Sequence, residues 1–108
     1  DFLLGDAGNN EVWGDYGDDH IWGRGGNDVL AGGNGLDTFH FTSGWGADRL
    51  LDYKVGGAEK LSFDGIAGLT SFSQLTLTDA AAGLTVSYGG NSILLQGIHT
   101  LSAGDCLF

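Results

Sequence analysis

The chain has 108 residues, enough for one domain with a modest core, and its 21 glycines without a single proline favour repeated turns over a helical bundle. Fourteen acidic residues against four basic ones give a formal net charge of −10, which argues against nucleic acid and anionic membrane surfaces as partners. A single cysteine, Cys106, excludes an internal disulfide, and no apolar run approaches the roughly 18 residues of a membrane span, so we expect no membrane insertion.

Residues 5–40 consist of four consecutive rows of nine residues, GDAGNNEVW, GDYGDDHIW, GRGGNDVLA and GGNGLDTFH. Every row has glycine at positions one and four, an apolar residue at position eight, and an aspartate or asparagine at position six. The position-six residues are Asn10, Asp19, Asp28 and Asp37. The opening residues 1–4 fit positions six to nine of an earlier row, so we expect further rows upstream of this sequence.

Each row predicts a tight turn followed by a short strand. Two glycines among six residues allow the backbone to curl and to aim its carbonyl oxygens inward. The last three residues of a row are mostly β-branched or aromatic, which suits a strand with its middle side chain buried. If two rows form one coil, strands of alternate rows stack in parallel about 4.8 Å apart. Position-six residues eighteen apart then face one another, as in the pairs Asp1 with Asp19, Asn10 with Asp28, and Asp19 with Asp37.

Stacked carboxylates of this kind indicate a bound cation. Without one, each pair would cost roughly 2–4 kcal/mol of repulsion at an effective dielectric of about 20. Carboxylate and carbonyl oxygens suit Ca²⁺, which accepts six to eight oxygens in tolerant geometry, whereas Mg²⁺ demands a near-ideal octahedron. We therefore predict about three calcium ions, with two to four as the range. The predicted ligands are Asp1, Gly5, Ala7, Gly8, Asn10, Gly14, Tyr16, Gly17, Asp19, Gly23, Gly25, Gly26, Asp28, Gly32, Asn34, Gly35, Asp37 and Asp48.

The four rows resemble the GGxGxDxUx nonapeptide of RTX (hemolysin-type calcium-binding) proteins. GGNGLDTFH matches in full, two rows depart only at the second glycine, and the first row also has Asn10 in place of aspartate. A neutral amide contributes less charge, so we expect the gap between Asn10 and Asp28 to bind calcium more weakly. A flexible glycine-rich linker would have no reason to keep an apolar residue at every ninth position. The resemblance implies an all-β fold, a right-handed parallel β-roll followed by a small antiparallel β-sandwich-like C-terminal cap.

Large side chains occupy the outward positions of the predicted strands. The expected columns are Leu4 with Trp22 and His40, Phe2 with His20 and Thr38, and Trp13 on the opposite sheet. Exposed aromatic side chains could bind a polysaccharide or a partner, but a downstream segment or an upstream domain could equally cover them. A zinc site at the two histidines lacks a third ligand at a recognisable spacing.

The nine-residue phase fades after residue 40. Gly44, Gly46 and Asp48 predict a last, irregular turn that completes the gap above Asp28. Leucines and a phenylalanine at positions 50–51 and 61–63 suggest two strands that cap the open end of the coil.

The stretches DRLLDY and EKLSFDG resemble the region that follows the repeats in RTX proteins. This resemblance implies that Asp52, Glu59 and Asp64 are further ligands, although solvated turn carboxylates are an equal alternative. From Thr70 onward, alternation predicts antiparallel strands at 74–78, 84–88 and 92–95, with a hairpin turn at 88–91 and a longer connection at 79–83. We thus divide the chain into a β-roll (1–40), a capping segment (41–69) and a C-terminal sheet with a tail (70–108).

The tail ends with Asp105 and three apolar residues. It resembles the extreme C-terminus of RTX proteins exported by type I (ABC-transporter) secretion, where such a sequence forms part of an uncleaved signal. A final strand that closes the sheet is the alternative, and both can hold together.

The sequence shows no catalytic motif. The serines lack a nucleophile elbow, no phosphate-binding loop is present, and Cys106 has no electropositive neighbour in sequence. We therefore expect a non-enzymatic module that folds on Ca²⁺ and carries the secretion signal of a larger extracellular protein. Its expected partners are the upstream domain of the same polypeptide and the type I transporter. The upstream region could be a hydrolase, protease or epimerase, and the alternative function is polysaccharide or partner binding.

Overall fold

The computed structural model describes residues 2–55, 59–63 and 66–108. In these residues the fold is almost entirely β, with two short 3₁₀ turns at Phe72–Gln74 and Ala103–Asp105. No helix in the described part of the chain is long and apolar enough to cross a bilayer. The strands are β1 (Phe2–Leu4), β2 (Glu11–Trp13), β3 (His20–Trp22), β4 (Val29–Ala31), β5 (Thr38–His40), β6 (Ala47–Leu50), β7 (Lys60–Ser62), β8 (Thr76–Ala80), β9 (Gly83–Tyr88), β10 (Asn91–Gln96) and β11 (Cys106–Leu107).

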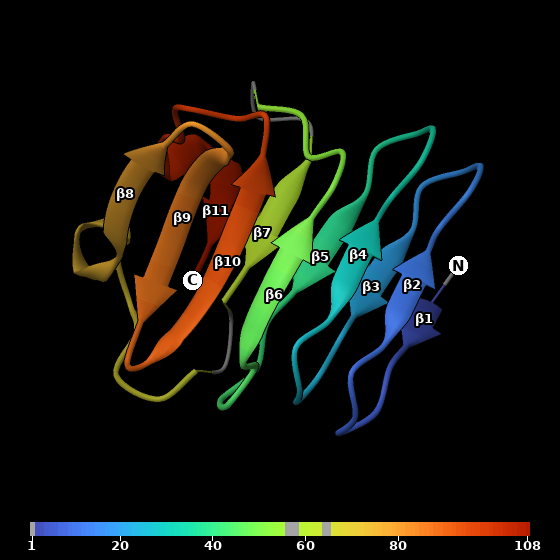
Figure 1. The fold of residues 1–108 in the computed structure, drawn as a ribbon, viewed down its shortest axis with the longest axis horizontal. Coiled ribbons are helices and arrows are strands. Elements are labelled where there is room, and N and C mark those ends of the chain that lie inside the picture. Colours follow the sequence, from blue (N-terminus) through green and yellow to red (C-terminus); the bar gives the residue numbers. More distant parts are fainter. Residues whose placement is uncertain (1, 56–58, 64–65) are drawn as a thin grey trace.

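The strands form two facing sheets, and the first seven alternate between them (Figure 1). One sheet has the order β1-β3-β5-β7-β11 and is parallel throughout. The other has the order β2-β4-β6-β10-β9-β8. Ile21 pairs with Leu3 on one side and with Phe39 on the other, each eighteen residues away. The predicted parallel β-roll with two rows per coil is therefore confirmed.

The position-eight side chains form the centre of the roll. Ile21, Leu30 and Phe39 are fully buried between the sheets, and Leu50 and Leu61 continue the same columns. Burying a side chain of this size stabilises a fold by about 1.5–3 kcal/mol. The regular apolar column thus accounts for the stacking of strands that are only three residues long.

The two strands predicted as caps are instead part of the roll. β6 pairs in parallel with β4, and β7 pairs in parallel with β5, so together they add a third coil. Beyond them the core is aromatic. The rings of Phe41, Trp45 and Phe63 pack with centroids 5.6 to 5.7 Å apart and fill the wide end of the roll.

The three predicted C-terminal strands are present, but they do not form a sandwich of their own. β8, β9 and β10 are antiparallel neighbours, and β10 pairs in parallel with β6. They therefore extend the second sheet of the roll (Figure 1). The physical reason is that the last row leaves the edge of β6 with unpaired backbone groups, which a further strand satisfies.

The turns of this sheet are tight. Gly89 and Gly90 have φ of 57° and 87° and form the predicted hairpin turn between β9 and β10. The predicted longer connection at 79–83 is wrong, because Asp79 and Ala80 belong to β8 and only residues 81–82 form the turn. Of the three alanines only Ala80 pairs with β9, where pairing overrides its low β propensity.

The tail closes the first sheet. β11 pairs in parallel with β7, the N–H of Phe63 donates to the carbonyl of Leu107 (2.8 Å), and the ring of Phe108 stacks on Phe63. Asp105 is buried, and its carboxylate lies 3.2 Å from the hydroxyl of Tyr53. The alternative of a closing strand is therefore confirmed for the folded chain.

Candidate metal centre

The turns of the roll lie along its two long edges, and each edge carries a ladder of position-six side chains. On one edge the ladder is Asn10, Asp28 and Asp48. On the other it includes Asp19 and Asp37. Asp1 was predicted to precede Asp19 in this ladder, but it lies outside the described residues.

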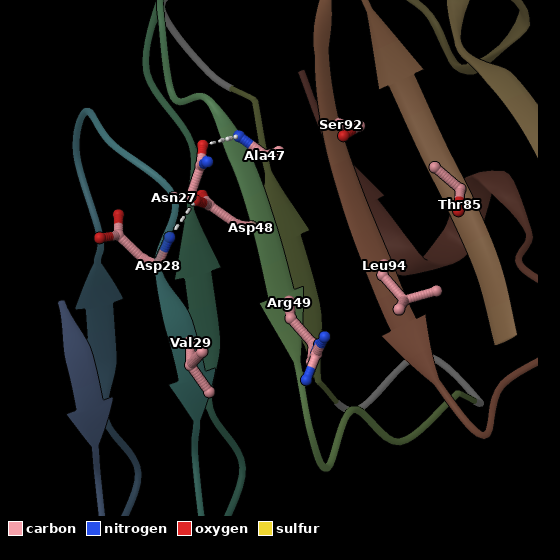
Figure 2. A pocket seen from close by; sticks show the side chains of 9 residues that line it. All are labelled: Asn27, Asp28, Val29, Ala47, Asp48, Arg49, Thr85, Ser92 and Leu94. Carbon is pink, nitrogen blue, oxygen red and sulfur yellow. Dashed lines mark hydrogen bonds between the residues drawn. The ribbon is translucent and has the colours of Figure 1, made fainter. Parts of the chain in front are cut away.

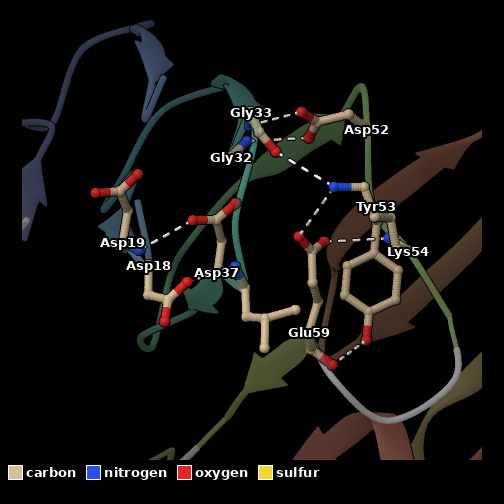
Figure 3. Close-up of polar contacts among 10 residues, drawn as sticks. Asp18, Asp19, Gly32, Gly33, Asp37, Asp52, Tyr53, Lys54 and Glu59 are labelled. Carbon is tan, nitrogen blue, oxygen red and sulfur yellow. Dashed lines mark hydrogen bonds and ion pairs between the residues drawn. The ribbon is translucent and has the colours of Figure 1, made fainter. Parts of the chain in front are cut away.

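One oxygen of each carboxylate binds the coil before it. Oδ1 of Asp28 accepts a hydrogen bond from the backbone N–H of Asn10 (2.8 Å). Oδ1 of Asp48 accepts one from the backbone N–H of Asp28 (2.9 Å) (Figure 2). On the opposite edge, Oδ1 of Asp37 accepts one from the N–H of Asp19 (2.9 Å) (Figure 3). The predicted pairings of Asn10 with Asp28 and of Asp19 with Asp37 are confirmed, as is the turn that places Asp48 above Asp28.

The second carboxylate oxygen has no such partner. Asp28 and Asp37 are 1% exposed and Asp48 is 4% exposed, yet Oδ2 of each makes no hydrogen bond within the protein. Burial raises the pKa of Asp28 and Asp37, against the lowering effect of the N–H donors, and it raises the pKa of Asp48 to about 7. Buried carboxylate oxygens of this kind are costly unless a cation or a proton compensates them.

The glycines at position one make room for these oxygens. A Cβ atom at Gly23 would lie 2.6 Å from Oδ2 of Asp28, and one at Gly32 would lie 2.1 Å from Oδ2 of Asp37. Neither contact is sterically possible for a real side chain. Each carboxylate therefore occupies a space that exists only because the residue beside it is glycine.

The position-four glycines bring backbone carbonyls close to the next coil. Gly26 and Gly35 have φ of 85° and 98°, in the left-handed region that favours glycine. A Cβ at Gly26 would lie 2.5 Å from the carbonyl oxygen of Gly8, and one at Gly35 would lie 2.2 Å from that of Gly17. The predicted carbonyl ligands thus stand between successive coils. Tyr16 is 81% exposed, so only its carbonyl could contribute.

The donor set fits calcium. Within residues 2–55, 59–63 and 66–108, no three side chains of His, Cys, Asp or Glu converge on one point. An ion in a gap would therefore be held by two position-six side chains together with turn carbonyls, which are all hard oxygen donors. Asp28 and Asp48 also line a groove of about 320 Å³, together with Asn27 and Arg49 (Figure 2).

Sequence reasoning missed a second ladder, at position five. The N–H of Asn27 donates to Oδ1 of Asn9 (2.8 Å), and the N–H of Ala47 donates to Oδ1 of Asn27 (3.0 Å). On the other edge the N–H of Leu36 donates to Oδ1 of Asp18 (2.8 Å). The sequence indicates this ladder by an Asn or Asp at position five of three rows. These side chains fix the spacing between turns.

The structure also explains the second glycine of the repeat. Position two has a left-handed backbone in three rows, with φ of 65° at Asp15, 67° at Arg24 and 77° at Gly33. Only glycine adopts this conformation without steric cost. The two rows with Asp15 and Arg24 at this position therefore carry local strain there.

The resemblance to RTX proteins also named Asp52, Glu59 and Asp64 as possible ligands, and their surroundings differ. Both carboxylate oxygens of Asp52 accept backbone N–H groups, from Gly32 (2.9 Å) and Gly33 (2.7 Å) (Figure 3). Glu59 is buried beside Lys54. Asp64 lies outside the described residues.

The outward aromatic columns are arranged as predicted. Phe2 pairs with His20, and Trp22 pairs with His40. The rings of Trp22 and His40 stack with centroids 4.0 Å apart, and the two histidines lie 2.9 Å apart, Nδ1 to Nε2. Phe2 is 73% exposed, so this ladder, Phe2–His20–Trp22–His40, presents rings on the outer face of the first sheet.

Comparisons with known proteins agree with this geometry. Residues 1–39 match the RTX calcium-binding nonapeptide repeat in four copies. No curated protein matches the sequence at a significant level. In structure the chain is similar to the AlgE6R3 subunit of the Azotobacter vinelandii mannuronan C5-epimerase, with 24% identity, a TM-score of 0.67, and coverage of 99% of this chain and 77% of that one.

The chain is also similar in structure to the extracellular lipase LipA from Serratia marcescens, with 22% identity and a TM-score of 0.65. That match covers 99% of this chain but only 20% of the lipase, so the chain spans a fifth of the lipase's length. At such identities these likenesses show the fold. Residues 1–39 are thus RTX (hemolysin-type) calcium-binding nonapeptide repeats, and the chain has the β-roll fold of these two structures.

Proposed function

We propose that the chain is a calcium-binding module that folds when Ca²⁺ fills the gaps between its coils. The observation that carries this proposal is the set of buried carboxylate oxygens without hydrogen-bond partners at Asp28, Asp37 and Asp48. Each of these oxygens faces the gap between its own coil and a neighbouring coil. A divalent cation there compensates two carboxylates at once.

The charge of the chain supports a folding role for the metal. Four basic residues cannot neutralise fourteen acidic ones, so the metal-free chain repels itself. Because the gaps exist only in the folded coil, the free energy of calcium binding becomes free energy of folding. We assign about three ions, in the gaps Asn10/Asp28, Asp19/Asp37 and Asp28/Asp48.

Far-ultraviolet circular dichroism tests this proposal. The chain is measured in EGTA, then with calcium, and then with the same concentration of magnesium as a control. We expect strand signal to appear with calcium and much less with magnesium, whose octahedral preference the tolerant gap does not meet. Strand signal that chelation leaves unchanged would show that folding does not depend on the metal.

We further propose that the module belongs to a larger secreted protein and carries its type I secretion signal in residues 105–108. Low calcium in the cytosol would keep the chain unfolded for the transporter, and extracellular calcium would then fold it. The structural likeness to an extracellular lipase supports this role. Export of a reporter fused to the chain, from cells with a type I transporter, should stop when residues 105–108 are removed. Unchanged export would refute the assignment.

A second candidate function is polysaccharide binding by the Phe2–His20–Trp22–His40 ladder. The exposed ring of Phe2 and the stacked, half-buried rings of the other three residues favour it, as does the likeness to a subunit of a mannuronan C5-epimerase. Catalysis would belong to the upstream region. In affinity electrophoresis, an acidic polysaccharide should retard the chain only with calcium present to bridge the charges, and Trp22→Ala should reduce the retardation. Equal retardation of both proteins would contradict a role for the ladder.

A further inference from the structure

The last gap on the Asp19–Asp37 edge has a basic side chain at its rim, that of Lys54, which is 57% exposed. Glu59 is 1% exposed, and its Oε1 accepts the backbone N–H of Lys54 (3.1 Å). The Nζ atom of Lys54 lies 3.8 Å from Oε2 of Glu59 and donates to the carbonyl oxygen of Gly33 (3.3 Å) (Figure 3). The ammonium group therefore joins a carboxylate of one coil to a turn carbonyl of the coil before it.

Backbone pairing shows that Glu59 is the next member of the ladder. The N–H of Thr38, which follows Asp37, donates to the carbonyl of Asp19 (2.9 Å). In the same way, the N–H of Lys60, which follows Glu59, donates to the carbonyl of Asp37 (3.2 Å). Glu59 thus lies one coil beyond Asp37 in the ladder, just as Asp37 lies one coil beyond Asp19. The separation in sequence is 22 residues for the first pair and 18 for the second.

The electrostatics of this gap match its geometry. Burial raises the pKa of both Asp37 and Glu59, and the ammonium of Lys54 acts in the opposite direction with a smaller effect. The nearby carboxylates of Asp19 and Asp52 act to raise the pKa of Asp37. An ammonium carries three N–H donors on a flexible stem, so it can face several oxygens at once. Its contacts are with the two oxygen types, carboxylate and carbonyl, that a calcium ion would take.

We propose that Lys54 takes the place of a calcium ion in the gap between Asp37 and Glu59, so that the ion ladder on this edge ends at a tethered positive charge. This inference rests on the proposed calcium-dependent folding, because it concerns how many gaps need an ion. It assigns Lys54 the role of a residue that sets the number of ions bound.

Native mass spectrometry of the calcium-saturated chain tests the inference by counting ions. Lys54→Gln removes the charge and leaves a gap lined by Asp37, Glu59 and the Gly33 carbonyl, so it should bind one more calcium ion than the wild type. Lys54→Arg keeps the charge and should bind the wild-type number. Lys60→Gln, with the same change in net charge at a side chain directed to the carbonyl of Gly104, should also bind the wild-type number.

The outcomes separate the two proposals. An unchanged or smaller count in Lys54→Gln overturns the role of Lys54 while leaving calcium-dependent folding intact. Failure of this variant to fold in saturating calcium also overturns it, since the ion should be able to replace the ammonium. A wild-type chain that binds no calcium would refute the proposed function itself.

Discussion

Replacing Gly32 with alanine tests why a glycine stands at position one. It distinguishes a need for room beside a ligand from a need for a flexible backbone. Gly32 does not have a left-handed backbone, so alanine brings no conformational strain. Its Cβ would lie 2.1 Å from Oδ2 of Asp37, and real Cβ atoms essentially never approach within 3.0 Å. The carboxylate must therefore move by about 0.9 Å, the difference between these distances.

This displacement is large compared with the tolerance of a calcium site. Calcium–oxygen distances span only about 2.3–2.6 Å, so Oδ2 of Asp37 would leave the ion it shares with Asp19. Changes in the surroundings of a metal ligand commonly weaken binding by about 10- to 100-fold, and we expect at least the lower figure, about 1.4 kcal/mol.

Isothermal titration calorimetry with calcium measures this loss, and Gly25→Ala is the matched control. Gly25 lies in the same array and likewise lacks a left-handed backbone, but its added Cβ would meet no atom closer than 3.7 Å. We expect wild-type affinity for Gly25→Ala and one weakened or lost site for Gly32→Ala. If the two variants titrate alike, Asp37 is not a ligand, and the role of the position-one glycine has another explanation.

Three further predictions test other parts of the structure. Asn10→Asp should strengthen calcium binding in the first described gap, and a calorimetric titration identical to the wild type would contradict this. Arg24→Gly should raise the free energy of unfolding by roughly 0.5–1 kcal/mol, because glycine adopts the φ of 67° without the strain of a side chain. Arg24→Ala should not raise it. Burial, followed by the Asp105 carboxylate, raises the pKa of the Cys106 thiol to about 12, so iodoacetamide at pH 8 should label it at least ~100-fold more slowly in calcium than in EGTA. Equal labelling rates would show that the tail is not folded onto β7.

The regular part of the fold followed from the sequence because each nine-residue row specifies its own turn and strand. Similar rows should stack alike, so the pairings of Asn10 with Asp28 and of Asp19 with Asp37 follow from the spacing once two rows are taken as one coil. The position of the C-terminal strands could not. Their alternation indicated an antiparallel sheet, but the pairing of β10 with β6 depends on which edge the last coil leaves open.

Glu59 was harder to place than Asp48. The step from Asp28 to Asp48 is 20 residues, and that from Asp37 to Glu59 is 22, so the nine-residue phase no longer identifies position six. The resemblance to RTX proteins named Glu59 as a possible ligand but gave no role to Lys54. The backbone pairing of Lys60 with Asp37 shows that the ladder continues, and the side-chain geometry places the ammonium of Lys54 beside Glu59 and the Gly33 carbonyl.

The ladder of position-six side chains on each edge of the roll has to end, and the requirements of a bound ion limit how it can end. Each ion needs ligands from the coil on either side, so the last ligand of a ladder must meet a group that needs no further ion. On the Asp48 edge the neighbouring strand supplies a neutral amide beside the last turn, because the N–H of Gly46 donates to Oδ1 of Asn91 (3.0 Å) at the start of β10. On the Asp37 edge that group is the ammonium of Lys54. The nonapeptide repeat thus borders the ordinary sheet at two side chains, one neutral and one positive, that lie outside the nine-residue pattern.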